Sequence, residues 1–173
     1  MPNFDAVLAA YQALPPRMHS LMLSTVNGAG LPHASYAPYV MDDDYQIYIF
    51  TSGLSAHTAN LQTTGLASLL IIEDEAEAPQ VFARQRITYD CRASLLPRRT
   101  PQWDAMADRF EQRFGDIIAM LRSLEDFKIF CLSPQEGRFV MGFGAAYVVD
   151  PTQLNQLLGP PIGPESGPEN RPK

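Results

Sequence analysis

The chain has 173 residues, of which 46% are hydrophobic and 18% charged, and its formal net charge is −6. This length favours one domain with a sizeable core over two domains. The negative charge argues against wide contact with nucleic acid, because binding to a phosphate backbone depends on clustered Lys and Arg. We therefore expect any bound anion to be small and held locally.

Apolar residues near the N-terminus recur at helical spacing. They predict an amphipathic helix that is ended by Pro15 and Pro16 and has as its apolar side Phe4, Val7, Leu8, Tyr11 and Leu14. Asp5 stands where a secretory signal would carry basic residues. Because no apolar run approaches the roughly 20 residues needed to cross a bilayer, we expect a cytoplasmic protein that makes no contact with a membrane.

The next segments have patterns typical of strands. Residues 19–41 predict a β-hairpin with its turn at NGAG, and residues 45–52 predict a third strand. The continuous apolar run at 66–74 predicts a fourth strand that is buried on both faces. Residues 81–96 predict a long fifth strand with two different faces, one with Phe82, Arg84, Arg86, Thr88, Asp90 and Arg92 and the other with Ala83, Ile87, Tyr89, Cys91 and Ala93.

The C-terminal half adds a helix and further strands. A single apolar stripe predicts one long helix from Thr100 to Leu121, and 126–150 predicts strands with a turn at SPQEG. The tail 159–173 is rich in Pro and Gly, which predicts disorder and leaves one domain at 1–158. Together these elements indicate an α+β fold built on a small, mainly antiparallel barrel of five or six strands.

The stretch TSGLSAH holds a candidate site for a small anion. Ser55 precedes a short helical run and is a favoured N-cap residue, so unpaired backbone N–H groups gather beside the hydroxyls of Ser52, Ser55 and Thr58. His57, at the second helical position, could add a ring N–H to a phosphate or carboxylate held there. The alternative is that Ser55 only caps the helix and His57 is solvated.

Arg84 and Arg86 are a second candidate for anion binding. Two residues apart on one strand face, their Cα atoms would be about 6.6 Å apart, which suits a phosphate or a pair of carboxylates. The alternative is that both arginines pair with the acidic residues of 73–77 just upstream.

Motifs for other chemistry are absent from the sequence. There is no GxSxG, P-loop or HExxH, and only three histidines occur, His19, His33 and His57. Cys91 and Cys131 lie far apart in strand-like runs, so we expect two reduced core thiols and no metal site. The GxG within GFGAAY lies in a strand-like run and predicts a bulge or a close backbone approach rather than a dinucleotide site.

Several segments resemble a known family. LSTVNGAGLPHASYAPYV, TSGLSAHTANL, ASLLIIEDEAEAPQVFARQRITYDCRA, FEQRFGDII and EDFKIFCLSPQEGRFVMGFGAAYVVD are similar, in order over about 17–150, to the haem-utilisation branch of the pyridoxamine 5′-phosphate oxidase-like, FMN-binding split-barrel superfamily. The resemblance implies a six-stranded antiparallel split β-barrel with flanking helices. It also implies a homodimer with cofactor sites at the interface between the two barrels.

The resemblance also implies which residues hold the cofactor. The positions that match those around the FMN phosphate in flavin-binding relatives are Thr51, Ser52, Ser55, His57, Arg84 and Arg86. This chain departs from those relatives at ASYAPYV, where they carry a basic RxVLLK-type strand, and at His57, where they usually carry lysine.

The haem-utilisation branch implies two further residues. Asp126 matches an aspartate that hydrogen-bonds the iron-ligating histidine of the other subunit, and Ser20 matches a threonine beside the haem. The C-terminal histidine that ligates iron in this branch has no counterpart, because no histidine follows His57. The resemblance thus implies redox chemistry linked to FMN or haem, with a non-catalytic haem or flavin carrier as the alternative.

Overall fold

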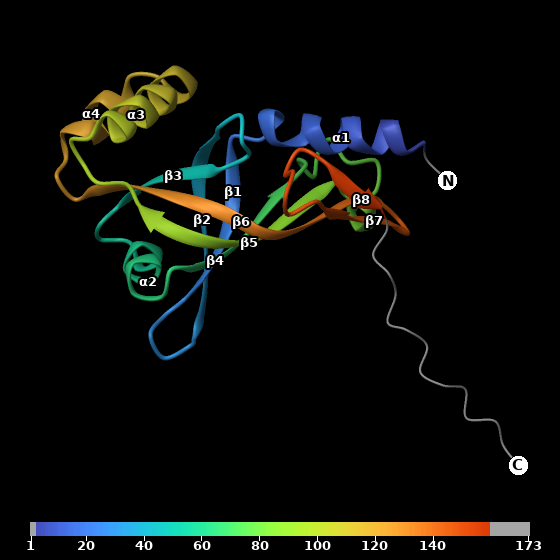
Figure 1. Ribbon diagram of the computed structural model, residues 1–173, viewed down its shortest axis with the longest axis horizontal. Coiled ribbons are helices and arrows are strands. Elements are labelled where there is room, and N and C mark those ends of the chain that lie inside the picture. Colours follow the sequence, from blue (N-terminus) through green and yellow to red (C-terminus); the bar gives the residue numbers. More distant parts are fainter. Residues whose placement is uncertain (1–2, 160–173) are drawn as a thin grey trace, which may run out of the picture.

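The structure is a computed structural model that describes residues 3–159 (Figure 1). In chain order its elements are α1 (Phe4–Arg17), β1 (Ser20–Val26), β2 (Pro32–Met41), β3 (Ile47–Ser52), α2 (Ala56–Thr64), β4 (Leu66–Ile72), the 3₁₀ helix η1 (Val81–Ala83), β5 (Arg86–Leu95), α3 (Pro101–Phe114), α4 (Ile117–Ser123), β6 (Phe127–Gly142), β7 (Ala145–Val149) and β8 (Leu157–Gly159). Of the tail predicted at 159–173, all but Gly159 lies outside the described residues.

Six strands close into a barrel. The sheet order is β3-β2-β1-β4-β5-β6-β7-β8, and β3 also pairs with β6. Every pairing is antiparallel, so the predicted six-stranded antiparallel barrel is confirmed. β7 and β8 extend the sheet beyond the closed ring.

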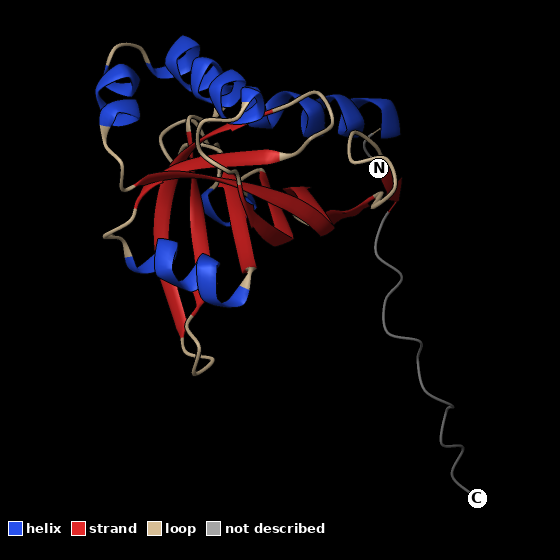
Figure 2. Ribbon diagram, turned by 60° about the vertical axis from the view of Figure 1, so that its left-hand side comes forward, coloured by secondary structure: helices blue, strands red, loops and turns tan. Residues whose placement is uncertain are grey.

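Strand alternation fills the inside of the barrel with large apolar side chains. Leu21 and Leu23 of β1 point inward, as do Leu69 and Ile71 of β4. α1 adds Val7, Tyr11 and Leu14 to this core, while α2 adds Leu61. Figures 1 and 2 show α1 on the side of the barrel opposite α2.

A second core covers part of the outside of the barrel. Its members are the outward side chains of β3 and β6 and the inner faces of α3 and α4, and they include Tyr48, Phe50, Ile129, Trp103 and Phe110. Both faces of β3 are therefore buried. No helix among the described residues has the length and apolar character needed to cross a membrane.

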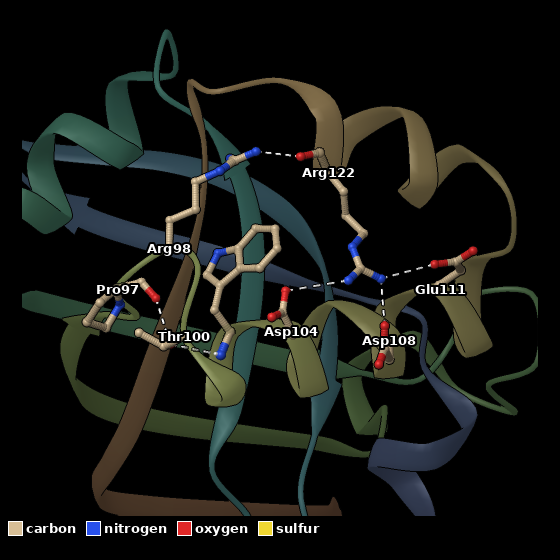
Figure 3. A network of polar contacts seen from close by, with 8 residues as sticks. Pro97, Arg98, Thr100, Asp104, Asp108, Glu111 and Arg122 are labelled. Carbon is tan, nitrogen blue, oxygen red and sulfur yellow. Dashed lines mark hydrogen bonds and ion pairs between the residues drawn. The ribbon is translucent and has the colours of Figure 1, made fainter.

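A charged network fixes the helical pair α3–α4 (Figure 3). Arg122 of α4 forms ion pairs at 3.6, 2.6 and 3.3 Å with Asp104, Asp108 and Glu111 of α3. The guanidinium of Arg122 also lies 5.8 Å from the centre of the Trp103 ring. These contacts fasten α4 against α3 over the second core.

The outward side of β1, β4 and β5, together with the adjoining Tyr36 of β2, stays uncovered in the single chain, and we call it the open face. Met22 on β1 pairs with Tyr36 on one side and with Leu70 on the other. Met22 is 54% exposed and Tyr36 64% exposed. Apolar side chains of this size on a sheet surface indicate a contact site for another molecule.

The structure corrects the predicted ends and breaks of two helices. α1 runs through Pro15 and Pro16 to Arg17, because the Tyr39 hydroxyl donates to the Pro15 carbonyl and Arg113 donates to the Pro16 carbonyl, which stabilises the last turn. The predicted helix 100–121 is two helices, separated at Gly115, whose φ of +79° ends the helical hydrogen-bonding pattern.

Three strand predictions are also wrong in part. β4 is buried on one face only, since its outward residues belong to the open face. The segment 81–83 forms η1, so β5 begins at Arg86. The predicted turn at SPQEG is a bulge within one long strand, β6, where Asp90 pairs with Glu136 but Cys91 pairs with Pro134. Proline lacks the N–H that a regular ladder needs, and a bulge accommodates it.

Candidate functional site

The turn after β3 holds Asp126 in place. Ser52, the last residue of β3, donates a hydrogen bond from its hydroxyl to the Asp126 carboxylate at 2.9 Å. The Gly53 N–H donates to the Asp126 carbonyl at 2.8 Å. A Cβ on Gly53 would lie 2.9 Å from that carbonyl oxygen, so only glycine permits this close approach.

The first turn of α2 lies beside the same turn. The Thr58 hydroxyl donates to the Ser52 carbonyl at 2.7 Å and lies 2.9 Å from the Thr51 hydroxyl. Ser55 is the N-cap residue, but its side chain makes no capping hydrogen bond, and the first turn carries no acidic residue. The Ser55 hydroxyl and the helix N-terminus are thus available to an anion.

His57 is the second residue of α2 and lies near His33 of β2. Asn60, one turn further along α2, donates to the Thr25 hydroxyl at 3.0 Å, and Thr25 pairs across the strands with His33. Burial first, and the neighbouring His33 second, lower the pKa of His57. The imidazole is therefore neutral at physiological pH, the form that offers a lone pair.

Four of the predicted site residues surround one turn, and His57 lies in the first turn of the helix that follows it. We call them the α2 site, which comprises Thr51, Ser52, Ser55, His57 and Asp126. They come from β3, from α2 and its N-cap, and from the residue before β6. Sequence reasoning missed Gly53 and His33, since only the fold shows that Gly53 contacts Asp126 and that His33 approaches α2.

Arg84 and Arg86 do not form the predicted pair on one strand face. Arg84 precedes β5, donates from Nε to the Glu73 carbonyl at 3.0 Å, and lies 3.4 Å from the Glu75 carboxylate. Arg86 begins β5 on the open face and donates to the Arg84 carbonyl at 3.0 Å. For Arg84 the alternative, contact with the upstream acidic segment, is confirmed.

The two arginines lie far from the α2 site of their own chain. Ser52 pairs with Phe127 at the start of β6, whereas Arg86 pairs with Val140 near its end. From position 127 to position 140 the strand covers roughly 40 Å, at about 3.3 Å per residue. In Figure 1, β6 crosses the molecule between these ends. One chain alone cannot bring Arg86 to the α2 site.

Ser20 also lies apart from the α2 site. It is an exposed residue at the start of β1, where it pairs with Pro38. Its side chain points outward, two residues along β1 from Met22. Ser20 and Arg86 thus share the open face, so the predicted site residues fall into two groups.

Two cavities open on the outside of the barrel. One, of about 440 Å³, is lined by β1, β4, β5 and β6, and the other, of about 530 Å³, extends from β5 and β6 to β7 and β8. Asp90 and Glu136 line both cavities. Within residues 3–159 no group of three or more His, Cys, Asp or Glu side chains is arranged to hold a metal ion.

Comparisons with known proteins match most of the chain. The family model described as pyridoxamine 5′-phosphate oxidase matches residues 7–141. Over 135 residues, which are 78% of this chain and 76% of the relative, the sequence is 41% identical to the haem oxygenase HutZ of Vibrio cholerae. The matched family segment includes both the α2 site and the open face.

Solved structures agree with this match. The crystal structure of HutZ from Vibrio cholerae, described there as a haem storage protein, has a TM-score of 0.73 at 36% identity and covers 82% of this chain and 97% of that one. Campylobacter jejuni ChuZ has a TM-score of 0.80 at 33% identity, over 88% of this chain and 63% of that chain. The barrel described above is therefore shared with both proteins.

Proposed function

Because the chain belongs to the pyridoxamine 5′-phosphate oxidase family, we propose that it binds haem as a homodimer and serves haem utilisation. The observation on which this rests is the 41% identity to a protein named haem oxygenase HutZ, over a segment of 135 residues. HutZ is named an oxygenase in one comparison and a storage protein in another. Binding of haem is common to both descriptions.

The site is composite, with the α2 site of one subunit facing the open face of the other. This arrangement explains why the two groups of predicted residues lie at opposite ends of β6 within one chain. Because a two-fold dimer uses the same surface on both subunits, it would form two such sites. Haem would then occupy the space between Asp126 of one subunit and Arg86 of the partner subunit.

The residues of the open face suit a porphyrin. Tyr36, Met22 and Leu70 form a continuous apolar row across three strands, which fits the flat ring. Arg86 lies on the same face, and apart from its bond to Arg84 its guanidinium forms no hydrogen bond or ion pair within the described part of the chain. A free guanidinium fork suits a haem propionate. When bound, haem supplies the redox chemistry of its iron, while these residues place and shield it.

FMN is the second candidate, and a specific observation favours it. The Ser55 hydroxyl makes no capping hydrogen bond, so it and the first-turn N–H groups of α2 could bind the FMN phosphate. Thr51 and Ser52 lie at the same turn. In this alternative the redox chemistry would be that of a flavin.

Titration of the purified protein with haem and with FMN, followed by absorbance, separates the two cofactors. We expect saturable binding of haem with a shifted Soret band, and weak or no retention of FMN. Flavin that copurifies with the protein, with no saturable haem binding, would overturn the haem proposal. Adding ascorbate to the haem complex then distinguishes the functions, since an oxygenase converts haem to biliverdin whereas a carrier leaves it intact.

A further inference from the structure

Leu54 is an exposed apolar residue within the α2 site. It follows Gly53 in the turn between β3 and α2 and is 93% exposed, more than any other large apolar side chain in residues 3–159. A single exposed leucine is common on protein surfaces. This one, however, lies next to Gly53, whose N–H donates to the Asp126 carbonyl. In the proposed dimer it would therefore meet the partner subunit.

The backbone holds Leu54 in place. Its N–H donates to the Ser52 hydroxyl at 3.2 Å, and the next N–H, that of Ser55, donates to the Ser52 carbonyl at 3.2 Å. On the other side of the residue, Gly53 is bonded to Asp126. The turn is thus fixed within the single chain, so burying the leucine side chain in an interface costs little backbone entropy.

One of the two cavities on the outside of the barrel suits an apolar side chain. The cavity of about 530 Å³ has apolar walls formed by Val148, Val149, Pro151 and Leu158, and we call it the β8 cavity. Leu158 is itself 57% exposed, so an inserted side chain would cover it. The cavity of about 440 Å³ is instead lined mainly by residues with polar side chains.

The position of the β8 cavity agrees with the composite cofactor site. Thr88 lines this cavity, and Arg86 lies two residues earlier on the same face of β5. Leu54 is adjacent to the residue that contacts Asp126. Insertion of Leu54 would therefore bring Asp126 beside Arg86 of the partner subunit, the two residues between which the proposed function places haem.

Two-fold symmetry makes this contact reciprocal. Leu54 lies near the start of β6, where Ser52 pairs with Phe127, whereas the β8 cavity lies further along β6, at Gly137. When two copies lie side by side in opposite directions, each leucine meets the cavity of the other copy. Phe143, which is 73% exposed, follows the end of β6, so the same arrangement does not bring it to a partner's β8 cavity.

We propose that Leu54 is the anchor of the dimer and inserts into the β8 cavity of a second copy of this chain. The inference rests on the proposed homodimer and adds the residue that fixes how the two subunits meet. The occupant is a second copy because the leucine and the cavity lie at ends of the molecule that a two-fold axis exchanges. Leu54 is thus a positioning residue, which acts on the cofactor site through Asp126.

Disulfide cross-linking tests this contact directly. A disulfide requires Cα atoms within about 7 Å of each other, so Leu54→Cys combined with Leu158→Cys should give covalent dimers under mild oxidation by copper phenanthroline. The native thiols, Cys91 and Cys131, are buried and should not react. The matched control is Leu31→Cys combined with Leu158→Cys, because Leu31 is 62% exposed but lies in the turn between β1 and β2. This control, like each single-cysteine variant, should give no covalent dimer.

The strength of the contact is measured by sedimentation equilibrium. We expect Leu54→Ala to raise the dissociation constant of the dimer by about 10-fold or more, the scale on which an interface loses affinity when one buried leucine side chain is removed. Leu31→Ala should leave this constant unchanged. Because Leu54 is exposed in the single chain, Leu54→Ala should keep the wild-type circular dichroism spectrum, which separates lost contact from misfolding.

Failure of the anchor can be told apart from failure of the proposed function. A wild-type dimer in which the Leu54–Leu158 cysteine pair gives no cross-link, or which Leu54→Ala does not weaken, would overturn the inference and leave haem binding untouched. Equal cross-linking through Leu31 would also overturn it. A wild-type chain that stays monomeric would refute the homodimer and the anchor together. Cross-linked dimers that bind no haem would support the anchor and refute the proposed function.

Discussion

Gly137 on β6 leaves space in the barrel core for the ring of Tyr89. A Cβ at this position would lie 2.7 Å from two carbons of the Tyr89 ring and 3.0 Å from the Cβ of Val149. Tyr89 cannot move aside easily, because it is fully buried and its hydroxyl lies 2.5 Å from that of Tyr11. We expect Gly137→Ala to lower the free energy of unfolding by about 1–3 kcal/mol, measured by urea denaturation.

The matched control lies on the same strand. A Cβ at Gly142 would meet no atom within 4 Å, so Gly142→Ala should change the free energy of unfolding by less than about 0.5 kcal/mol. Equal losses of unfolding free energy in the two variants would show that any side chain added to β6 is destabilising and that contact with Tyr89 is not the cause.

A second residue-level prediction concerns the two neighbouring histidines. His57 has a folded pKa below its ordinary value of 6.5, lowered by burial and then by His33. Its stabilising effect is therefore complete above about pH 6.5 and is lost as the pH falls through the folded pKa. We expect His33→Gln to raise the pKa of His57 part of the way towards 6.5, as measured by NMR titration of the ring. His19→Gln should leave it unchanged, and an unaltered His57 titration in His33→Gln would contradict the proximity of the two rings.

At this scale the sequence predicted part of the candidate site. The local sequence pattern identifies Ser55 as the N-cap residue of α2, because helix capping is a local property. Ser52 and His57 follow from it because they flank that cap. The expected partnership of Arg84 and Arg86 failed because the Glu73 carbonyl binds Arg84, a contact that depends on how the loop after β4 folds. Local pattern cannot predict such a contact.

Among the elements, the pair α3–α4 depends on contacts that span the two helices. Arg122 meets three carboxylates and the Trp103 ring, and its side chain is 27% exposed. Surface ion pairs contribute up to about 1 kcal/mol each and do not add fully, and a cation–π contact contributes a similar amount. We expect Arg122→Ala to lower the free energy of unfolding by about 1–2 kcal/mol, with a smaller loss at high salt.

Arg109, which lies on α3, is the control for Arg122→Ala. It forms no hydrogen bond or ion pair with other side chains in the described part of the chain, so Arg109→Ala should have little effect on urea denaturation. A loss of stability in Arg122→Ala that does not depend on salt would indicate lost packing rather than lost ion pairs.

The elements that the sequence predicted correctly are those with a regular local pattern. The hairpin at 19–41, the third strand and the alternation of β5 from Arg86 onward are confirmed. The error at β4 has a simple cause, since burial of the outer side of a strand depends on which helices pack there. α3 and α4, distant in sequence, cover β3 and leave the outward side of β4 on the open face.

Buried tyrosine hydroxyls and a buried thiol predict that the molecule as a whole becomes less stable at alkaline pH. Burial raises the pKa values of Tyr11, Tyr39 and Tyr89 above 10.0 and that of Cys91 from 9.0 to about 12. The folded chain thus keeps protons that the unfolded chain loses, so stability is complete below about pH 9 and falls as the pH rises further. We expect the melting temperature to drop between about pH 9 and pH 11, and a melting temperature that stays constant over this range would contradict the burial of these groups.

The open face leads to the prediction for assembly. In a two-fold dimer both subunits use the same surface, here the open face together with the α2 site, so Met22, Tyr36 and Leu70 would be covered by the partner subunit. Charged residues such as Arg86 and Asp90 lie along the edge of the open face on β5, which is the usual anatomy of an interface. A carboxylate at position 22 would be buried without a partner charge, so we expect Met22→Asp to weaken dimerisation strongly, as measured by light scattering at micromolar concentration.

Met120→Asp is the matched control, because Met120 is 53% exposed, close to the 54% of Met22, but lies on α4. A monomeric wild-type chain, or equal dissociation of both variants, would show that the open face is not the contact surface and would remove the composite cofactor site with it.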